Sequence, residues 1–135
     1  MRLRIKTKGS PELVDISAQV QKSVANSGVL DGLVLVNVIG STAAVSTLEF
    51  EPGLIKDQRV LTEKLVPKQA DYAHNAAGGD GNGYSHLRAT LYKSSLVLPV
   101  ENGSVVLGTW QQIVLMEFDN RPREREIVIK IIAEK

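Results

Sequence analysis

Short segments rich in Val, Ile and Leu recur along most of the chain, and they limit its fold more than any other feature. Residues 33–39 read LVLVNVI, and similar apolar segments occupy residues 43–48, 96–100, 110–118 and 127–132. Branched apolar side chains favour strands, and a near-continuous apolar run is typical of a strand covered on both faces. Because these segments come in runs and do not alternate strictly with helices, they predict an α+β fold.

The N-terminal segment adds two strands and a helix to this pattern. Residues 2–6 alternate basic and apolar side chains, as in a half-buried strand, and a second short strand follows a turn at residues 9–11. Ser17 is a suitable N-cap for a helix over residues 18–27, and Gly28 would end that helix.

The C-terminal third contains the most specific turn signal. Asn102 and Gly103 separate the apolar segments 96–100 and 104–107, and Asn-Gly is the strongest short signal for a hairpin. We therefore expect the last four strands to form an antiparallel meander. With about eight Val-rich strands in all, the sheet is expected to be strongly curled and barrel-like.

Two further helices are expected in the middle of the chain. The apolar spacing of residues 55–66 is helical, and Pro67 would end that helix. Residues 76–83 are small and rich in glycine, which predicts a loop, and a short helix is expected to begin near Gly83. The sequence thus predicts one α+β domain, residues 1–135, with a mostly antiparallel, barrel-like sheet and two or three helices.

Composition excludes several classes of function. The 16 basic and 15 acidic residues give a net charge of +1, and aromatics make up 4%, which disfavours nucleic acid as a partner. The absence of cysteine excludes disulfide scaffolds, thiolate zinc sites and cysteine nucleophiles. The N-terminus lacks the apolar stretch of a signal peptide, and no apolar run is long enough to span a membrane. We therefore expect a cytoplasmic protein with no membrane partner.

The two histidines of the chain flank a single glycine-rich segment. Residues 74–88 read HNAAGGDGNGYSHLR. The polar side chains of this segment with useful chemistry are His74, Asp80, Asn82, Ser85, His86 and Arg88. Glycines such as Gly81 and Gly83 let backbone N–H groups approach an anion, and the N-terminus of a following helix would favour the same ligand. The pattern predicts a site for a phosphorylated small molecule, and an ordinary surface loop explains it equally well.

A divalent metal is a second possibility for the same segment. His74, Asp80 and His86 offer imidazole and carboxylate ligands, so Mg²⁺ or Zn²⁺ could bind with an open coordination position. The alternative is that each histidine is simply exposed or hydrogen-bonded, because two histidines twelve residues apart do not form a metal motif by themselves.

A few residues outside this segment could also take part in binding or catalysis. Ser41 and Thr42 lie at a break between two strands, where their hydroxyls could bind phosphate or satisfy the turn. Glu49 would matter as a general base or metal ligand only beside a histidine. Trp110 is the only tryptophan, and we expect it to pack in the tertiary structure. Residues 121–126 (RPRERE) are expected to form a solvated turn.

Three of these segments together resemble a known family. The chain resembles the YjbQ-like family, also called the secondary thiamine-phosphate synthase family. The resemblance covers nearly the whole chain in order and rests on the strings VNVIGSTAAVSTLEFEPG, GDGNGYSHLRATL and LVLPVENGSVVLGTWQQIVLMEFD. The resemblance implies an α+β domain with a barrel-like sheet, assembled as a homotrimer. It also implies a reaction that joins a pyrimidine diphosphate to a thiazole phosphate and releases pyrophosphate, normally with Mg²⁺.

The resemblance implies roles for individual residues. Positions that match the family are Glu49, His74, Asp80, Asn82, His86, Trp110 and Gln111. The expected catalytic residues are His86, His74 and Glu49. The expected ligand-binding residues are Ser41, Thr42, Asp80, Gly81, Asn82, Gly83, Ser85, Arg88, Trp110 and Gln111. Gly40 and Tyr84 stand where many relatives have histidine, which favours a second hypothesis: a non-catalytic trimer that binds a small ligand or a metal.

Overall fold

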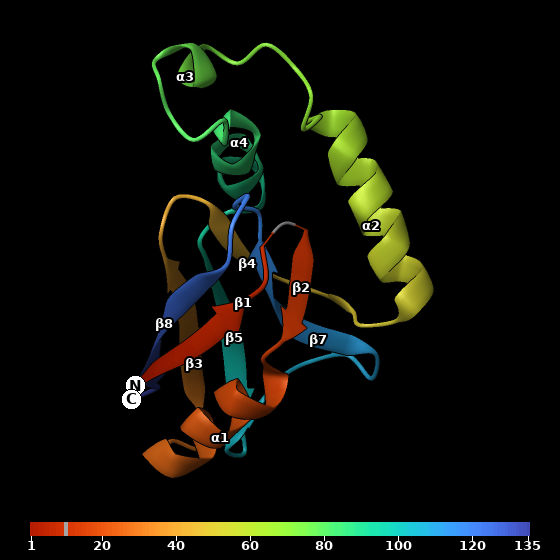
Figure 1. Ribbon diagram of the computed structural model, residues 1–135. Coiled ribbons are helices and arrows are strands. Elements are labelled where there is room, and N and C mark those ends of the chain that lie inside the picture. The colour runs from red at the N-terminus through yellow and green to blue at the C-terminus, as the bar shows by residue number, and fades with distance from the viewer. Residues whose placement is uncertain (10) are drawn as a thin grey trace.

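Two antiparallel sheets and four helices make up the computed structural model, which describes residues 1–9 and 11–135 (Figure 1). One sheet has the strand order β1-β8-β3-β5-β6, and the other has the order β2-β7-β4. The strands are β1 (Arg2–Thr7), β2 (Glu12–Asp15), β3 (Gly32–Ile39), β4 (Ala43–Glu49), β5 (Ser95–Glu101), β6 (Ser104–Val105), β7 (Gln111–Glu117) and β8 (Arg123–Ala133). The turn predicted at residues 9–11 includes Ser10, which lies outside the described residues.

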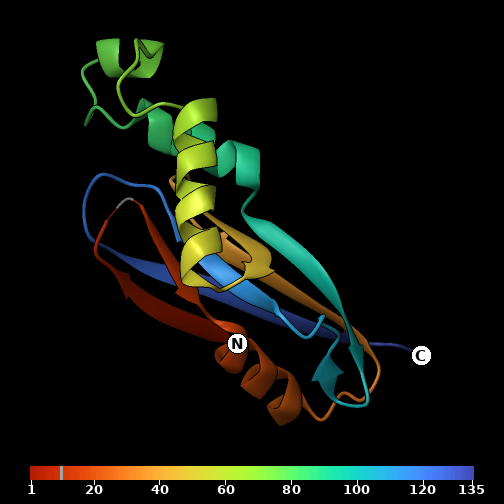
Figure 2. The same cartoon turned by 90° about the vertical axis from the view of Figure 1, so that its right-hand side faces the viewer.

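The helices lie at both ends and along one side of the two sheets. They are α1 (Ser17–Ser27), α2 (Pro52–Leu65), α3 (Ala73–Ala76) and α4 (Gly83–Tyr92). α1 lies at one end, α3 and α4 lie at the opposite end, and α2 stands alongside (Figures 1 and 2). The sequence predicted two or three helices and missed α3, because four residues are too short to show helical periodicity. Among the described helices, none is long and apolar enough to cross a membrane.

The inner faces of the two sheets enclose the main hydrophobic core. Every second residue of β3 points inward, and β4, β7 and β8 contribute in the same way. The members from these strands include Val34, Val36, Val38, Val45, Ile113, Leu115, Ile127 and Ile129. Ile16, Val20 and Val24 close the core at the α1 end. The curled antiparallel arrangement forms a half-barrel, so the predicted α+β class with a barrel-like sheet is confirmed.

Two helix ends show how local residues set the element boundaries. Asp15 Oδ1 accepts a hydrogen bond from the Ser17 N–H at 2.9 Å, so Ser17 is the first helical residue and not the predicted cap. Gly28 ends α1 in the left-handed conformation, with φ of 71°, as predicted. α2 begins at Pro52, earlier than the predicted residue 55, because Glu51 accepts two N–H groups of its first turn.

The predicted meander of the last four strands is wrong. β5 and β6 do form the predicted hairpin, and Asn102 and Gly103 have φ of 51° and 74°, as a two-residue turn of this kind requires. β7 instead pairs with β2 and β4, whereas β8 pairs with β1 and β3. Local turn signals reveal hairpins, but they carry no information about pairing between distant segments.

β3 is covered on one face only, although its apolar run predicted cover on both. Leu33 and Ile39 on its outer face are 45% and 47% exposed, and the cross-strand pairing places Val97 and Ile132 on that same face. The strand that is buried on both faces is β7. Its second face packs in a smaller core, which also includes Leu13, Ala44, Ala89 and Phe118.

Candidate functional site

A groove opens at the α4 end of the two sheets. The β3–β4 turn, the loop between α3 and α4, and the start of β8 line a cavity of about 410 Å³. We call this cavity the arginine groove. Its lining residues are Gly40, Ser41, Thr42, His74, Gly79, Asp80, Asn82, His86, Arg123 and Arg125. The fold thus brings the predicted histidine segment together with the predicted hydroxyl pair, although they are far apart in the sequence.

The two histidines meet beside this groove. The ring centroids of His74 and His86 lie 4.7 Å apart, with the planes at 64°. His74 Nε2 lies 3.2 Å from Asn82 Oδ1, and Asn82 Nδ2 donates a hydrogen bond to Asp119 Oδ1 at 3.3 Å. The Asn82 Nδ2 atom donates to Asp119, so the Asn82 Oδ1 atom faces the imidazole of His74. An amide oxygen only accepts, so His74 Nε2 is the donor in this contact. The contact with Asn82 therefore fixes the position of the His74 ring beside His86.

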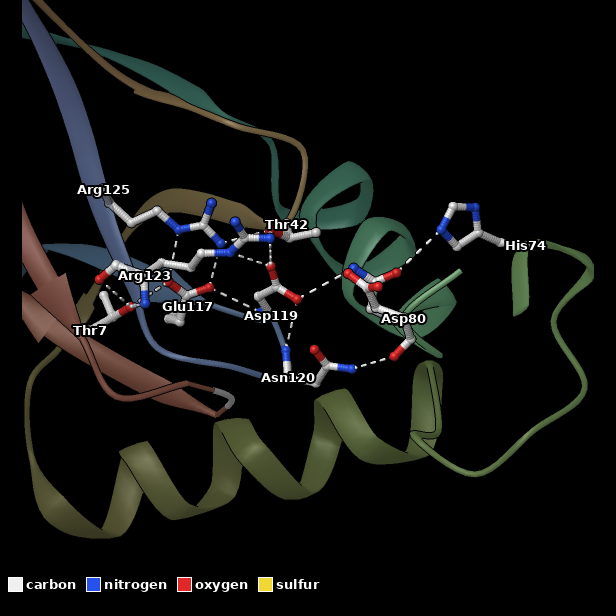
Figure 3. A network of polar contacts seen from close by, with 10 residues as sticks. Thr7, Thr42, His74, Asp80, Glu117, Asp119, Asn120, Arg123 and Arg125 are labelled. Atoms are coloured by element: carbon white, nitrogen blue, oxygen red, sulfur yellow. Dashed lines mark hydrogen bonds and ion pairs between the residues drawn. The ribbon is translucent and has the colours of Figure 1, made fainter. Parts of the chain in front are cut away.

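A network of buried charges lies behind the groove (Figure 3). Glu117 and Asp119 are both fully buried. Arg125 donates to both carboxylate oxygens of Glu117, at 2.7 and 2.5 Å, and Arg123 Nε donates to Asp119 Oδ2 at 2.7 Å. The Thr42 hydroxyl accepts from Arg125 Nη2 at 2.7 Å and donates to Asp119 Oδ2 at 3.2 Å. Each guanidinium is therefore held in one orientation by its own buried carboxylate.

The carboxyl group of Asp119 stays ionised in this environment. Burial by itself raises the pKa of Asp119, but the hydrogen bonds from Arg123, from the Asn120 N–H and from Asn82 outweigh that effect. The pKa of this carboxyl therefore lies below its ordinary value. A permanent negative charge at Asp119 fixes Arg123 on one side and the Asn82 amide on the other.

The two guanidinium groups retain donors for a ligand. Arg123 and Arg125 both line the groove, and among the described residues no protein acceptor bonds the Nη1 atom of either one. A Cβ built on Gly40 would lie only 2.8 Å from Arg125 Nη1, so the glycine leaves room for this guanidinium. Guanidinium donors match the oxygens of phosphate in geometry and charge. The arrangement can therefore hold an anion.

Comparison with known proteins assigns the family. The family described as UPF0047 protein YjbQ-like matches residues 1–134. The chain belongs to this YjbQ-like family. A UPF0047 protein of Archaeoglobus fulgidus is 42% identical over 132 residues, which cover 98% of this chain and 100% of the relative.

Solved structures show the same fold. A YbjQ-like protein of unknown function from Sulfolobus solfataricus matches with a TM-score of 0.90 and 36% identity, over 99% of this chain and 97% of that chain. An uncharacterised YjbQ/UPF0047 protein of Clostridium acetobutylicum matches with a TM-score of 0.89 and 38% identity, over 98% and 99% of the two chains. The resemblance found in the sequence is thus confirmed for family and fold.

The sequence interpretation of this YjbQ-like protein missed the arginine pair. Residues 121–126 were expected to be a solvated turn, but Arg123 begins β8, where it pairs with Thr7 of β1. One signal in the sequence could have revealed this pair. Charged residues alternate at Arg123 and Arg125 in RPRERE and at Glu117 and Asp119 in EFD. Arg123 and Arg125 share a face of β8 because they are two residues apart on a strand, and they reach the carboxylates of Asp119 and Glu117.

Four predicted residues of the histidine segment do not line the groove. Arg88 donates to the Val66 carbonyl and pairs with Glu63 at 2.6 Å on another side of α4, so it does not line the arginine groove. The Gly83 N–H donates to Asn75 Oδ1 at 2.9 Å and is not available to an anion. Ser85 is fully buried, and Gly81 does not line the groove either.

The two departures from the family pattern differ in their consequences. Tyr84 is fully buried, and its ring packs against the Arg88 guanidinium. The Arg88 Cζ atom lies 4.9 Å from the centroid of the Tyr84 ring. The Tyr84 side chain is therefore outside the arginine groove. Gly40 does line the groove, next to Arg125. Only the departure at position 40 changes the groove itself.

Glu49, Trp110 and Gln111 lie at the far end of the smaller sheet. Ala43 pairs with Glu117 near the groove, and Glu49 pairs with Gln111 six residues further along, a distance of about 20 Å. The Gln111 side-chain amide donates a hydrogen bond to the Thr47 hydroxyl and accepts one from the Gly108 N–H. Trp110 precedes β7 and is 72% exposed, so the expectation that it packs is wrong. Within one chain, none of the three reaches the arginine groove.

The predicted metal ligands do not assemble in this arrangement. No group of three or more His, Asp or Glu side chains in residues 1–9 and 11–135 is placed to hold a metal ion. His74 Nε2 is engaged by Asn82, and the two histidine rings meet edge to face. The donor set of His74, Asp80 and His86 therefore does not fit a divalent metal as arranged.

Proposed function

We propose that this YjbQ-like protein binds a phosphorylated small molecule in the arginine groove. The observation that carries the proposal is the pair Arg123 and Arg125, each fixed by a buried carboxylate and each with an Nη1 edge left for a ligand. The exposed Ser41 adds a hydroxyl in the same groove. Preorganised guanidinium groups bind phosphate strongly because they lose little freedom on binding.

We further infer that the reaction is thiamine-phosphate formation, as the resemblance implies. Pyrophosphate leaves the pyrimidine substrate in this reaction and carries away negative charge. Arg123 and Arg125 would stabilise that charge, and His86 is placed beside the same groove to donate a proton to the departing oxygen. His74 would keep its proton on Nε2 through Asn82 and orient the neighbouring His86 ring.

Phosphate binding is tested by removing one guanidinium. We expect Arg123→Gln to weaken the binding of inorganic phosphate by about tenfold or more, because one charge-assisted contact is lost. Calorimetric titration measures the affinity, and the shifts of the imidazole signals report the place, since His74 and His86 are the only histidines. Lys22→Ala on α1 removes the same charge far from the groove and should change nothing. Equal affinity in Arg123→Gln, or phosphate that leaves both imidazole signals unmoved, would overturn the proposal.

A second candidate is ligand binding without turnover. Two observations favour it. No three side chains among the described residues are placed to hold a metal ion, and Gly40 stands beside Arg125 where many relatives have an imidazole. Phosphate binding in a protein that forms no thiamine phosphate from the two substrates would support this candidate.

We also propose that the protein assembles as a homotrimer. The outer face of the larger sheet supports association, because Leu33, Ile39, Val97 and Ile132 are all at least 45% exposed there. The expected mass in solution is three times that of the 14.7 kDa chain, as measured by light scattering. A particle of 14.7 kDa at the same concentration would contradict the assembly.

A further inference from the structure

Lys93 has a backbone conformation that lysine rarely adopts. It follows α4 directly, with φ of 75° and ψ of 151°, a region that is essentially reserved for glycine. Three backbone hydrogen bonds impose this conformation. The Lys93 N–H donates to the Ala89 carbonyl at 2.9 Å, the Val45 N–H donates to the Lys93 carbonyl at 3.1 Å, and the Val38 N–H donates to the Ser94 carbonyl at 2.9 Å. The fold therefore requires positive φ at this position, and glycine would meet that requirement without strain.

The strained residue lines a cavity that adjoins the arginine groove. This second cavity measures about 300 Å³, and Lys93 lines it together with Thr90 and Ser94. We call it the lysine cavity. Gly40, Ser41 and His86 line both the lysine cavity and the arginine groove. The two cavities therefore adjoin at His86, with Arg123 and Arg125 lining one and Lys93 lining the other.

We propose that Lys93 is a second anion-binding residue, so that the site takes a small molecule with two anionic groups. A phosphate would occupy the arginine groove, and the second group, a phosphate or a carboxylate, would lie at the lysine cavity with the linking portion beside His86. The ammonium of Lys93 suits this task, because it is a compact charge with three donors. This inference rests on the proposed phosphate binding and adds a ligand class to it.

The second charge explains why a strained lysine is retained where glycine would fit. Backbone strain of this kind recurs at ligand-binding positions, where the contact that a side chain makes offsets its conformational cost. The Thr90 hydroxyl donates to the His86 carbonyl at 2.9 Å, so the charge at this end of the site comes from Lys93.

The experiment compares ligands with one and two phosphates. The probes are straight-chain alkanediol bisphosphates of three to six carbons, the matching monophosphates, and inorganic phosphate, each titrated by calorimetry. We expect the wild-type protein to bind the best-fitting bisphosphate about tenfold or more tightly than its monophosphate. Lys93→Gly should lose this preference and keep its affinity for inorganic phosphate. It should also raise the melting temperature by about 3–8 °C, because the strain is relieved.

Two control variants make the result specific. Lys93→Arg keeps the charge and should keep most of the preference for the bisphosphate, whereas Lys22→Ala removes a distant charge and should leave it intact. The inference is overturned if inorganic phosphate binds but the wild-type protein shows no preference for any bisphosphate, or if Lys93→Gly retains the preference. If inorganic phosphate does not bind at all, the proposed function fails as well, so the two failures are distinguishable.

Discussion

Glu117→Ala is expected to lower the free energy of unfolding by about 3–5 kcal/mol, the largest stability effect that we predict for a single substitution. Glu117 is fully buried and accepts four hydrogen bonds, two from Arg125, one from the Thr7 hydroxyl and one from the Asp119 N–H. Its removal leaves the Arg125 charge buried without a partner, and the cost of that unpaired charge dominates. Urea or thermal unfolding followed by circular dichroism measures the change.

An ion pair at the surface of the same sheet supplies the matched control. Arg4 and Glu124 pair at 3.5 Å with side chains 73% and 50% exposed, so Glu124→Ala should shift stability by less than about 1 kcal/mol. The double variant Glu117→Leu with Arg125→Met should regain much of the lost stability, because both buried charges disappear together. That double variant should bind inorganic phosphate about tenfold or more weakly than the wild type, because the Arg125 guanidinium is absent. A Glu117→Ala protein as stable as the wild type would refute the buried ion pair.

The His86→Ala protein is expected to lose thiamine-phosphate formation by about 100-fold or more, the usual contribution of a general acid. His86 lies between the arginine groove and the lysine cavity, with its ring against that of His74. Substitution removes the proton donor and leaves both arginines in place. The measurement is the rate of pyrophosphate release from a pyrimidine diphosphate and a thiazole phosphate.

Phosphate affinity separates this loss from a loss of binding. Inorganic phosphate should bind His86→Ala within about threefold of the wild-type affinity, because Arg123 and Arg125 make the charged contacts. Lys22→Ala again serves as the control for purification and folding. Unchanged turnover in a folded His86→Ala protein would eliminate His86 as a catalytic residue. A wild-type protein that binds phosphate and forms no thiamine phosphate would leave binding without turnover as the function.

The sequence indicated which candidate residues lie together where those residues are close in the chain. His74, Asp80, Asn82 and His86 lie within thirteen residues, and all four line one groove. Arg88 shows where the same reasoning failed. It is close to these residues in the chain, but the rotation of α4 directs it to Glu63 and Val66. A helix places neighbouring residues on different faces, and only its packing decides which face meets the groove.

The sequence by itself determined the local elements of this protein. The Asn102–Gly103 hairpin and the end of α1 at Gly28 depend on intrinsic conformational preferences of residues adjacent in the chain. Family membership also followed from the sequence, because the matching strings extend along nearly the whole chain.

The tertiary structure alone decided the sheet order and the composition of the arginine groove. β7 pairs with β2 and β4 and not with β6 and β8, which are its neighbours in the sequence. This pairing places Glu117 of the smaller sheet against Arg125 of the larger sheet. Such pairings reflect the free energy of the whole core, which no short window of sequence contains. The glycine-rich segment with its two histidines remains one wall of the site. The arginines that would hold its ligand come from a strand about 40 residues away, brought there by the packing of the two sheets.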